Sequence, residues 1–148
     1  MAEVKFNINP WYAPISETWK NGSPPIFTYN ETPVYSNDSG LEVYEMTGLN
    51  DDTFALGHYY EVRWVNKNGE KEKRWVFFQD GPIPEEGVTG LTTEALLVIA
   101  IHRTSTLNSK FPCEENELAI LHMKKALDWF NTRTEKRKAR GVEGHLKP

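Results

Sequence analysis

The sequence FPCEENELAILHMKKALDWFNTRTEKRKARGVEGHLKP, residues 111–148, has the pattern of one long amphipathic helix followed by a glycine-containing tail. We predict a helix from about Cys113 to about Ala139, ended by Gly141. At 100° per residue, four apolar side chains fall on one stripe of this helix, with Asn116 at its N-terminal end and Thr134 at its C-terminal end. The stripe consists of Ile120, Met123, Leu127 and Phe130.

Two arginines, Arg133 and Arg137, lie one turn apart near the end of this helix and flank the stripe, in line with Ala119 and Ala126. Small side chains beside two guanidinium forks would leave a trough for a flat ligand. The two forks match the oxygens of a pyrophosphate. The alternative is that they only complement the helix dipole, as basic residues in a last turn often do.

Two residues near the start of the helix could contact an adenine base. The amide of Asn116 can form two hydrogen bonds with adenine N6 and N7, and Phe111 can stack on a base. The ordinary alternatives are that Asn116 helps to cap the helix and that Phe111 belongs to the core.

A second helix precedes this one. Thr92 is a plausible N-cap, and we predict a helix from there to about Arg103. Its residues 95–101 are apolar on all sides, so we expect them to be buried against both a sheet and the helix that starts near Cys113. The segment Thr104–Pro112 is a short connector, which predicts an antiparallel helical hairpin.

The sequence pattern of the N-terminal half predicts β-strands. Alternating residues at Tyr59–Val65 and Lys73–Phe78 flank Asn68-Gly69, a pair that tolerates positive φ and favours a β-hairpin. Tyr60, Val62 and Trp64 share one face of the first strand, and Glu61, Arg63 and Val65 share the other. Shorter strands are expected at Leu41–Met46 and Ile26–Tyr29, and a loop at Gln79–Gly90.

These elements predict an α+β fold, with a small antiparallel β-sheet in the N-terminal half packed with a C-terminal two-helix antiparallel hairpin. We expect a single domain, 1–148, made of an irregular arm (1–40), the sheet and loop (41–90), and the helical hairpin with its tail (91–148). Prolines and polar residues in the arm favour an extended coat, with a role in subunit assembly as the alternative.

The charge and the cysteine content of the chain disfavour some classes of function. The formal net charge is −4, which disfavours binding to DNA or RNA polymers. Residues 1–91 hold 7 basic and 14 acidic side chains, whereas residues 132–148 hold 6 basic and 2 acidic ones, so the basic end suits a small anion. With a single cysteine, no secretion signal and no long apolar run, we expect a soluble protein of the cytoplasm, with no membrane contact.

No catalytic arrangement emerges from the sequence. The four histidines and the single cysteine lack metal-ligand spacing, and P-loop, GxGxxG and GxSxG motifs are absent. We therefore expect a protein that is not an enzyme, with no cofactor and no metal. The alternatives are a cyclic-nucleotide phosphodiesterase, which would need paired His-x-Thr/Ser motifs or a metal cluster, and a structural or protein-interaction module.

From about Gly57 to His145, the chain resembles the bacteriophage anti-Thoeris and anti-CBASS sponges that share a C-terminal helical hairpin. The resemblance rests on GHYYEVRW, VFFQDGPIPEEGVTGLTTEALLVIAIHR, FPCEENELAI, ALDWFNTRT and RKARGVEGH, in that order. It implies sequestration, without cleavage, of cyclic ADP-ribose-type signals of Thoeris systems. In some members cyclic di- or trinucleotides of CBASS bind at separate sites, and pockets are shared between the subunits of dimers or hexamers.

The resemblance also implies roles for particular residues. Asn116 matches the adenine-contacting asparagine, and Arg133 and Arg137 match the arginine pair. Arg103 matches the arginine at the end of the first helix. Leu107 stands where the family often has an aromatic residue, so Phe111 or a residue of a neighbouring subunit would supply the stacking.

Overall fold

The structure is a computed structural model that describes residues 26–141. These residues divide into two compact units. The β-sheet unit comprises residues 26–80 with 88–90, and the helical unit comprises residues 81–87 with 91–141. The predicted α+β class, with antiparallel strands first and two long helices last, is confirmed. That the whole chain acts as one domain stays a prediction.

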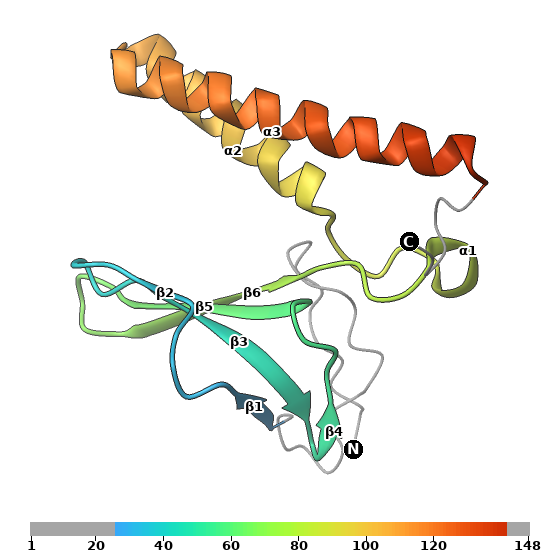
Figure 1. The fold of residues 1–148 in the computed structure, drawn as a ribbon. Coiled ribbons are helices and arrows are strands. Elements are labelled where there is room, and N and C mark those ends of the chain that lie inside the picture. The colour runs from blue at the N-terminus through green and yellow to red at the C-terminus, as the bar shows by residue number, and fades with distance from the viewer. Residues whose placement is uncertain (1–25, 142–148) are drawn as a thin grey trace, which may run out of the picture. The chain divides into compact units, whose positions relative to one another are not determined.

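The β-sheet unit is an antiparallel sheet in the order β1-β3-β5-β6, and two short strands, β2 and β4, also pair with β3 (Figure 1). All four predicted strands are present, and β3 is longer than expected. The two short strands are not predicted by the sequence pattern. The bounds are β1 Phe27–Tyr29, β2 Tyr35–Ser36, β3 Glu42–Leu49, β4 Asp52–Thr53, β5 Tyr59–Val65 and β6 Lys71–Phe77. The predicted arm, 1–40, thus contains β1 and β2 in its last part, and its residues 1–25 lie outside the described residues.

The predicted β5–β6 hairpin is confirmed, with Tyr59 opposite Phe77 and Val65 opposite Lys71. Its turn differs in one respect from the prediction, because only Gly69 has a positive φ, of 80°. The side chain of Asn66 accounts for this turn. Its Oδ1 accepts hydrogen bonds from the backbone N–H groups of Asn68, at 2.9 Å, and Glu70, at 3.0 Å. Asn68 therefore keeps an ordinary conformation.

The core of the sheet unit lies on one face of the sheet. Met46, Trp75 and Phe77 are its buried members. Partly buried aromatic side chains pack around them, namely Phe27, Tyr29, Phe54 and Tyr59. Glu61 projects from the same face of β5 as Tyr59 and is only 3% exposed. The face that carries Tyr60, Val62 and Trp64 is half-buried.

The predicted loop at 79–90 contains one short helix, α1, Ile83–Glu86, which starts directly after Pro82. The ends of the loop are fixed to each other. Thr89 donates its N–H to Oε1 of Gln79 at 2.9 Å, and its hydroxyl accepts the N–H of Asp80 at 2.9 Å. Asp80 also accepts the hydroxyl of Tyr59 at 2.6 Å, which attaches this loop to β5.

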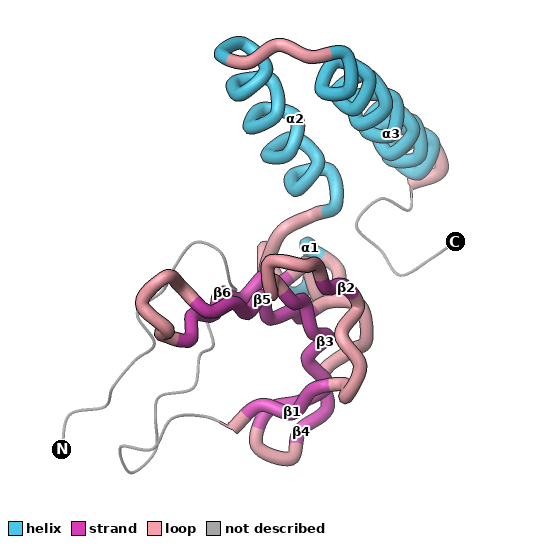
Figure 2. The backbone as a smooth tube through the Cα atoms, turned by 90° about the vertical axis from the view of Figure 1, so that its left-hand side faces the viewer, coloured by secondary structure: helices cyan, strands magenta, loops and turns pink. Residues whose placement is uncertain are grey.

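The helical hairpin consists of α2, Thr93–Lys110, and α3, Glu114–Ala139, packed against each other (Figure 2). The N-cap prediction for Thr92 is confirmed, since its hydroxyl accepts the N–H of Ala95 at 3.1 Å. At the other end, Gly141 has a φ of 69° and bonds back to the carbonyl of Lys138 at 3.0 Å, as expected for the residue that follows a helix.

The predicted end of the first helix at Arg103 is wrong. The helix continues to Lys110, and the connector is only Phe111–Cys113. Hydroxyl side chains in the added turns bond to carbonyls four residues earlier, so polar residues that are typical of loops fit within the helix. These bonds join Thr104 to Ala100, Thr106 to His102 and Ser109 to Ser105. No helix of the described residues has the length and hydropathy needed to cross a bilayer.

Candidate functional site

The apolar stripe of α3 is confirmed as its packing face. Its side chains are half-buried at a spacing of three or four residues, while the residues between them are mostly exposed. This repeat is the seam expected for two helices that pack along their length. The half-buried positions are Asn116, Ile120, Met123, Ala126, Leu127, Phe130 and Thr134, and Arg137, which follows them on the same side, is buried.

The two arginines predicted as a clamp occupy different environments. Arg137 continues the seam and is 8% exposed, with contacts that hold it there. Arg133, one turn earlier, is exposed. The expectation that both arginines flank the stripe is therefore correct only in part. In the single chain the guanidinium of Arg137 is largely shielded from solvent, whereas that of Arg133 is accessible to a ligand or a second chain.

At the opposite end of the hairpin, the residues predicted to face a base are accessible. Phe111 is 75% exposed and Leu107 is 38% exposed. Arg103, Leu107 and Phe111 are spaced by four residues, so they follow one side of α2 as it ends. Leu107 lies inside α2 and not in the connector where the sequence interpretation placed it.

Asn116 is half-buried in the first turn of α3. The N-cap of this helix is Cys113, which makes no side-chain capping bond. Within the described residues, the amide of Asn116 has no hydrogen-bond partner, so the ordinary role of helping to cap the helix does not account for it. A half-buried amide without such a role is suited to an incoming ligand.

The long helix keeps the two groups of residues apart. At 1.5 Å per residue, Asn116 and Arg133 are about 25 Å apart along α3, and Asn116 and Arg137 about 31 Å. One small nucleotide cannot touch both groups in a single chain. The structure therefore brings Asn116 close to the Phe111 end of the hairpin and leaves the arginine pair at the other end.

Among residues 26–141, no three His, Cys, Asp or Glu side chains gather as a metal site would require. Sequence reasoning did not identify the polar group around Glu61 in the sheet unit. The only signal was an acidic residue on the strand face opposite Tyr60, Val62 and Trp64.

Comparison with known proteins supports the resemblance for the hairpin. Residues 74–135 match the family described as Acb2/Tad1, hairpin domain. This segment of the chain is therefore similar to that hairpin domain. The match includes Arg103, Leu107, Phe111, Asn116 and Arg133, and it ends two residues before Arg137.

A curated relative is similar over part of the chain. It is named Thoeris anti-defense 1, from Bacillus phage SBSphiJ7, and is 46% identical over 70 residues. The aligned segment is 47% of this chain and 49% of the relative, so the chain spans about half the length of the protein it matches.

Proposed function

We propose that this chain is a phage anti-defence protein that binds and sequesters cyclic ADP-ribose-type immune signals of Thoeris systems without cleaving them. The support is the hairpin of the Acb2/Tad1 family together with the name of the similar phage protein. The place of action in this proposal is the cytoplasm of the infected bacterial host.

Each predicted residue has a physical role in such a complex. Arg133 and Arg137 would hold the two adjoining phosphates, since charge-assisted hydrogen bonds are worth about 1.5–3 kcal/mol each. Asn116 would bind the adenine edge. Arg103, Leu107 and Phe111 would form a partly apolar wall along the base.

The geometry supports a pocket shared between copies of the chain. Because Asn116 and the arginines lie at opposite ends of α3, a second copy in antiparallel orientation would place the arginines of one chain beside Asn116 of the other. The hairpin also has apolar side chains that self-association would cover. These are Leu96, Val98, Ile99, Leu118, Leu121 and Trp129, which are 38% to 75% exposed in the single chain. A homodimer or homohexamer is the corresponding assembly.

The first experiment is calorimetry with a panel of cyclic ADP-ribose isomers. We expect tight binding and recovery of the intact ligand after the protein is denatured by heat. Arg133→Ala and Arg137→Ala should each weaken binding by at least tenfold, while light scattering shows an unchanged assembly. Lys136→Ala is the matched control, because it removes an exposed cation from the same turns of α3. Normal binding by both arginine variants would contradict the site.

A mixing experiment tests the shared pocket directly. Asn116→Ala and the double variant Arg133→Ala/Arg137→Ala should each fail to bind alone. When the two are unfolded together and refolded as a mixture, a two-fold symmetric dimer should recover about a quarter of the sites. No recovery from a mixture that has reassembled would show that each pocket lies within one chain.

Two further measurements distinguish the proposed function from its alternatives. Cyclic di- and trinucleotides of the CBASS type, added after saturation with a cyclic ADP-ribose isomer, should bind at separate sites if this chain shares that property. Recovery of a linear or hydrolysed nucleotide would favour a phosphodiesterase instead. A protein that binds none of the panel but still self-associates would be an interaction module.

A further inference from the structure

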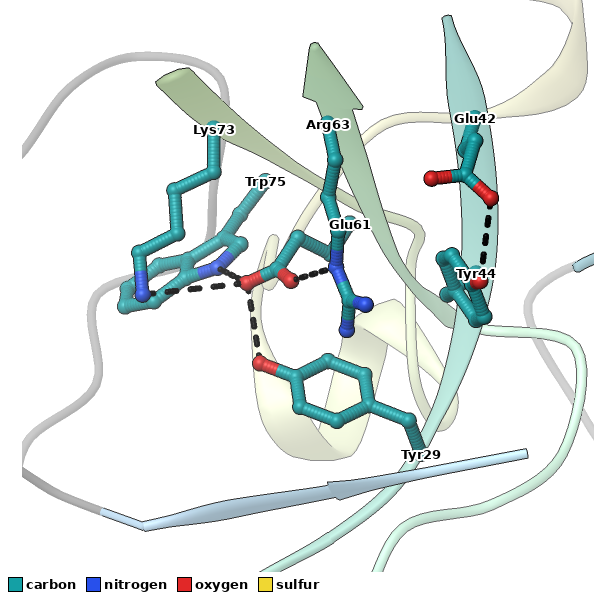
Figure 3. A network of polar contacts seen from close by, with 7 residues as sticks. All are labelled: Tyr29, Glu42, Tyr44, Glu61, Arg63, Lys73 and Trp75. Carbon is teal, nitrogen blue, oxygen red and sulfur yellow. Dashed lines mark hydrogen bonds and ion pairs between the residues drawn. The ribbon is translucent and has the colours of Figure 1, made fainter. Parts of the chain in front are cut away.

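Around Glu61 in the sheet unit, charged and aromatic side chains find their partners within the chain (Figure 3). The carboxylate of Glu61 accepts hydrogen bonds from Arg63 Nε at 2.6 Å, Trp75 Nε1 at 2.8 Å and the hydroxyl of Tyr29 at 2.9 Å. Burial by itself raises the pKa of Glu61, but these hydrogen bonds outweigh burial and hold that pKa below its usual value. The guanidinium of Arg63 also lies 4.0 Å from the ring centre of Tyr44 and 4.6 Å from that of Tyr29. Cation, acid and rings satisfy one another here.

The side chain of Trp129 on α3 has no such partners. It is 75% exposed, and no large apolar side chain among residues 26–141 is more exposed. Within the same residues, its indole N–H has no hydrogen-bond partner, and its ring makes no contact with another ring or a cation. Exposed tryptophan is typical of binding surfaces, because covering one large flat ring removes much apolar area from water. The indole of Trp129 is therefore available to an occupant from outside this chain.

Cations flank Trp129 along its side of α3. Lys125 is four residues before it and Arg133 four residues after it, and side chains at this spacing are neighbours on a helix. Lys136 and Arg140 follow on the same side, at seven and eleven residues from Trp129. All four cations are exposed, and in the described part of the chain none of them forms an ion pair.

The acids of the hairpin do not neutralise this side of α3. At 100° per residue, Asp128 and Glu135 lie about 100° and 120° away from Trp129 around the helix axis. The three acids in the first turn of α3 are about 18 Å or more from Trp129 along the axis. Glu94, the acid of α2, is half-buried, and within residues 26–141 it forms no ion pair with α3. The charge beside the exposed indole is therefore positive.

This charge indicates what kind of occupant suits the indole. Two copies that packed directly through this side of α3 would bring cations beside cations, which is unfavourable. A nucleotide matches both features, because its base can stack on the indole of Trp129 and its phosphate can accept hydrogen bonds from Arg133. Arg133 follows Trp129 by about 6 Å along the helix axis, and in a nucleotide a single ribose separates the base from the phosphate.

We propose that Trp129 is a further binding residue for the nucleotide, with the base stacked on its indole and the neighbouring phosphate held by Arg133 of the same chain. This inference rests on the proposed function and adds a residue to its shared pocket. The base then lies between Trp129 of one copy and Phe111 of a second copy. Because stacking on an aromatic ring tolerates every base, Trp129 contributes affinity, whereas Asn116 selects adenine.

The test uses the full chain, calorimetry with the cyclic ADP-ribose isomer that binds most tightly in the panel, and light scattering. Trp129→Leu keeps an apolar side chain but removes the aromatic ring, so it should weaken binding at least tenfold while the assembly is unchanged. Trp129→Phe keeps a ring and should restore most of the affinity. Asn131→Ala, exposed on another side of the same turn of α3, is the control and should bind normally.

NMR of the indole N–H of Trp129, assigned as the signal that disappears in Trp129→Phe, reports the contact itself and should shift when the same isomer saturates the protein. If the wild-type chain binds no member of the panel, the proposed function fails and this inference with it. If the wild type binds, the inference alone is overturned when Trp129→Leu binds as tightly, when Trp129→Phe binds as weakly as Trp129→Leu, or when the indole signal does not move. A Trp129→Leu variant that no longer assembles would assign the indole to the contact between copies and overturn the inference as well.

Discussion

The β-sheet unit and the helical unit bury their apolar side chains to different extents. The sheet unit encloses Met46 and Phe77, which are 0% and 1% exposed, and it buries a charged residue with a full set of hydrogen bonds. In α2 and α3, by contrast, the only buried residue is Arg137. The apolar side chains of the seam between the two helices are no more than half-buried.

This difference indicates how each unit is stabilised. A sheet with its own enclosed core can be stable in a single chain. Two helices that share only one seam remove less apolar surface from water, so burial stabilises them less. The helical unit therefore has most to gain from a second copy. The chain has only three methionines, so their methyl signals are easily resolved. Met46 lies in the sheet core and Met123 in the helix seam, and each can therefore report on the stability of its own unit.

The largest expected effect is from Phe77→Ala. Removal of a buried phenylalanine side chain costs about 3–5 kcal/mol of the free energy of unfolding. Phe130→Ala in the half-buried seam is the matched substitution and should cost clearly less in dilute protein. Urea unfolding followed by the methyl signals of Met46 and Met123 measures each unit separately. Equal costs would mean that the hairpin has a core as enclosed as that of the sheet.

Glu61→Ala should destabilise the sheet unit by about 3–5 kcal/mol, because it leaves the guanidinium of Arg63 and two further donors without their buried acceptor. Glu70→Ala, in the exposed turn of the same hairpin, is the control and should have little effect. The unfolding midpoint of the Met46 signal measures both. A cost for Glu61→Ala as small as that of the control would show that the carboxylate does not hold this network together.

The acid stability of the sheet unit should depend on the same residue. The pKa of Glu61 is lower in the folded chain than its ordinary value of 4.5, so its contribution is present above that pH and is lost as the pH falls through the folded pKa. Below pH 4.5, the unfolding free energy of the wild type should fall more steeply than that of Glu61→Gln, by at most about 1.4 kcal/mol per pH unit. Parallel acid profiles would show that Glu61 has a normal pKa.

Dilution of the protein should affect the stability of the two units differently. If copies associate through the hairpin, the stability reported by Met123 should fall by about 1.4 kcal/mol for each tenfold dilution of a dimer, since association follows mass action. The Met46 signal, which comes from a core within one chain, should be almost independent of concentration. A Met123 signal that does not depend on concentration would mean that the hairpin is stable alone.

Sequence patterns predicted the elements that are set by local periodicity. The α3 stripe from Ile120 to Phe130 and the β5–β6 hairpin follow directly from spacings of 3.6 and 2 residues. The extension of α2 from Thr104 to Lys110 was missed because serine and threonine disfavour helices on average, and only the structure shows their hydroxyls bonded to the preceding turn.

The candidate site was predictable by residue type but not by arrangement. Sequence spacing placed Arg133 and Arg137 beside the same stripe, and it could not show that one is buried and the other exposed. The role of Glu61 depends on donors from Tyr29, Arg63 and Trp75 on three different strands. Tyr29 and Trp75 are 32 and 14 residues away from Glu61 in the sequence, and contacts over such separations leave no local pattern.

The smallest expected effect is at the start of the hairpin. Thr92→Ala removes the hydroxyl that accepts the N–H of Ala95, and loss of such a cap costs about 1 kcal/mol. Thr93→Ala, one residue later in α2, removes a hydroxyl that makes no capping bond and should be nearly neutral. The Met123 signal should register the loss in Thr92→Ala and the Met46 signal should not. If instead both signals shift together, the two units unfold as one, and the contrast between an enclosed sheet and an open hairpin would not extend to their stability.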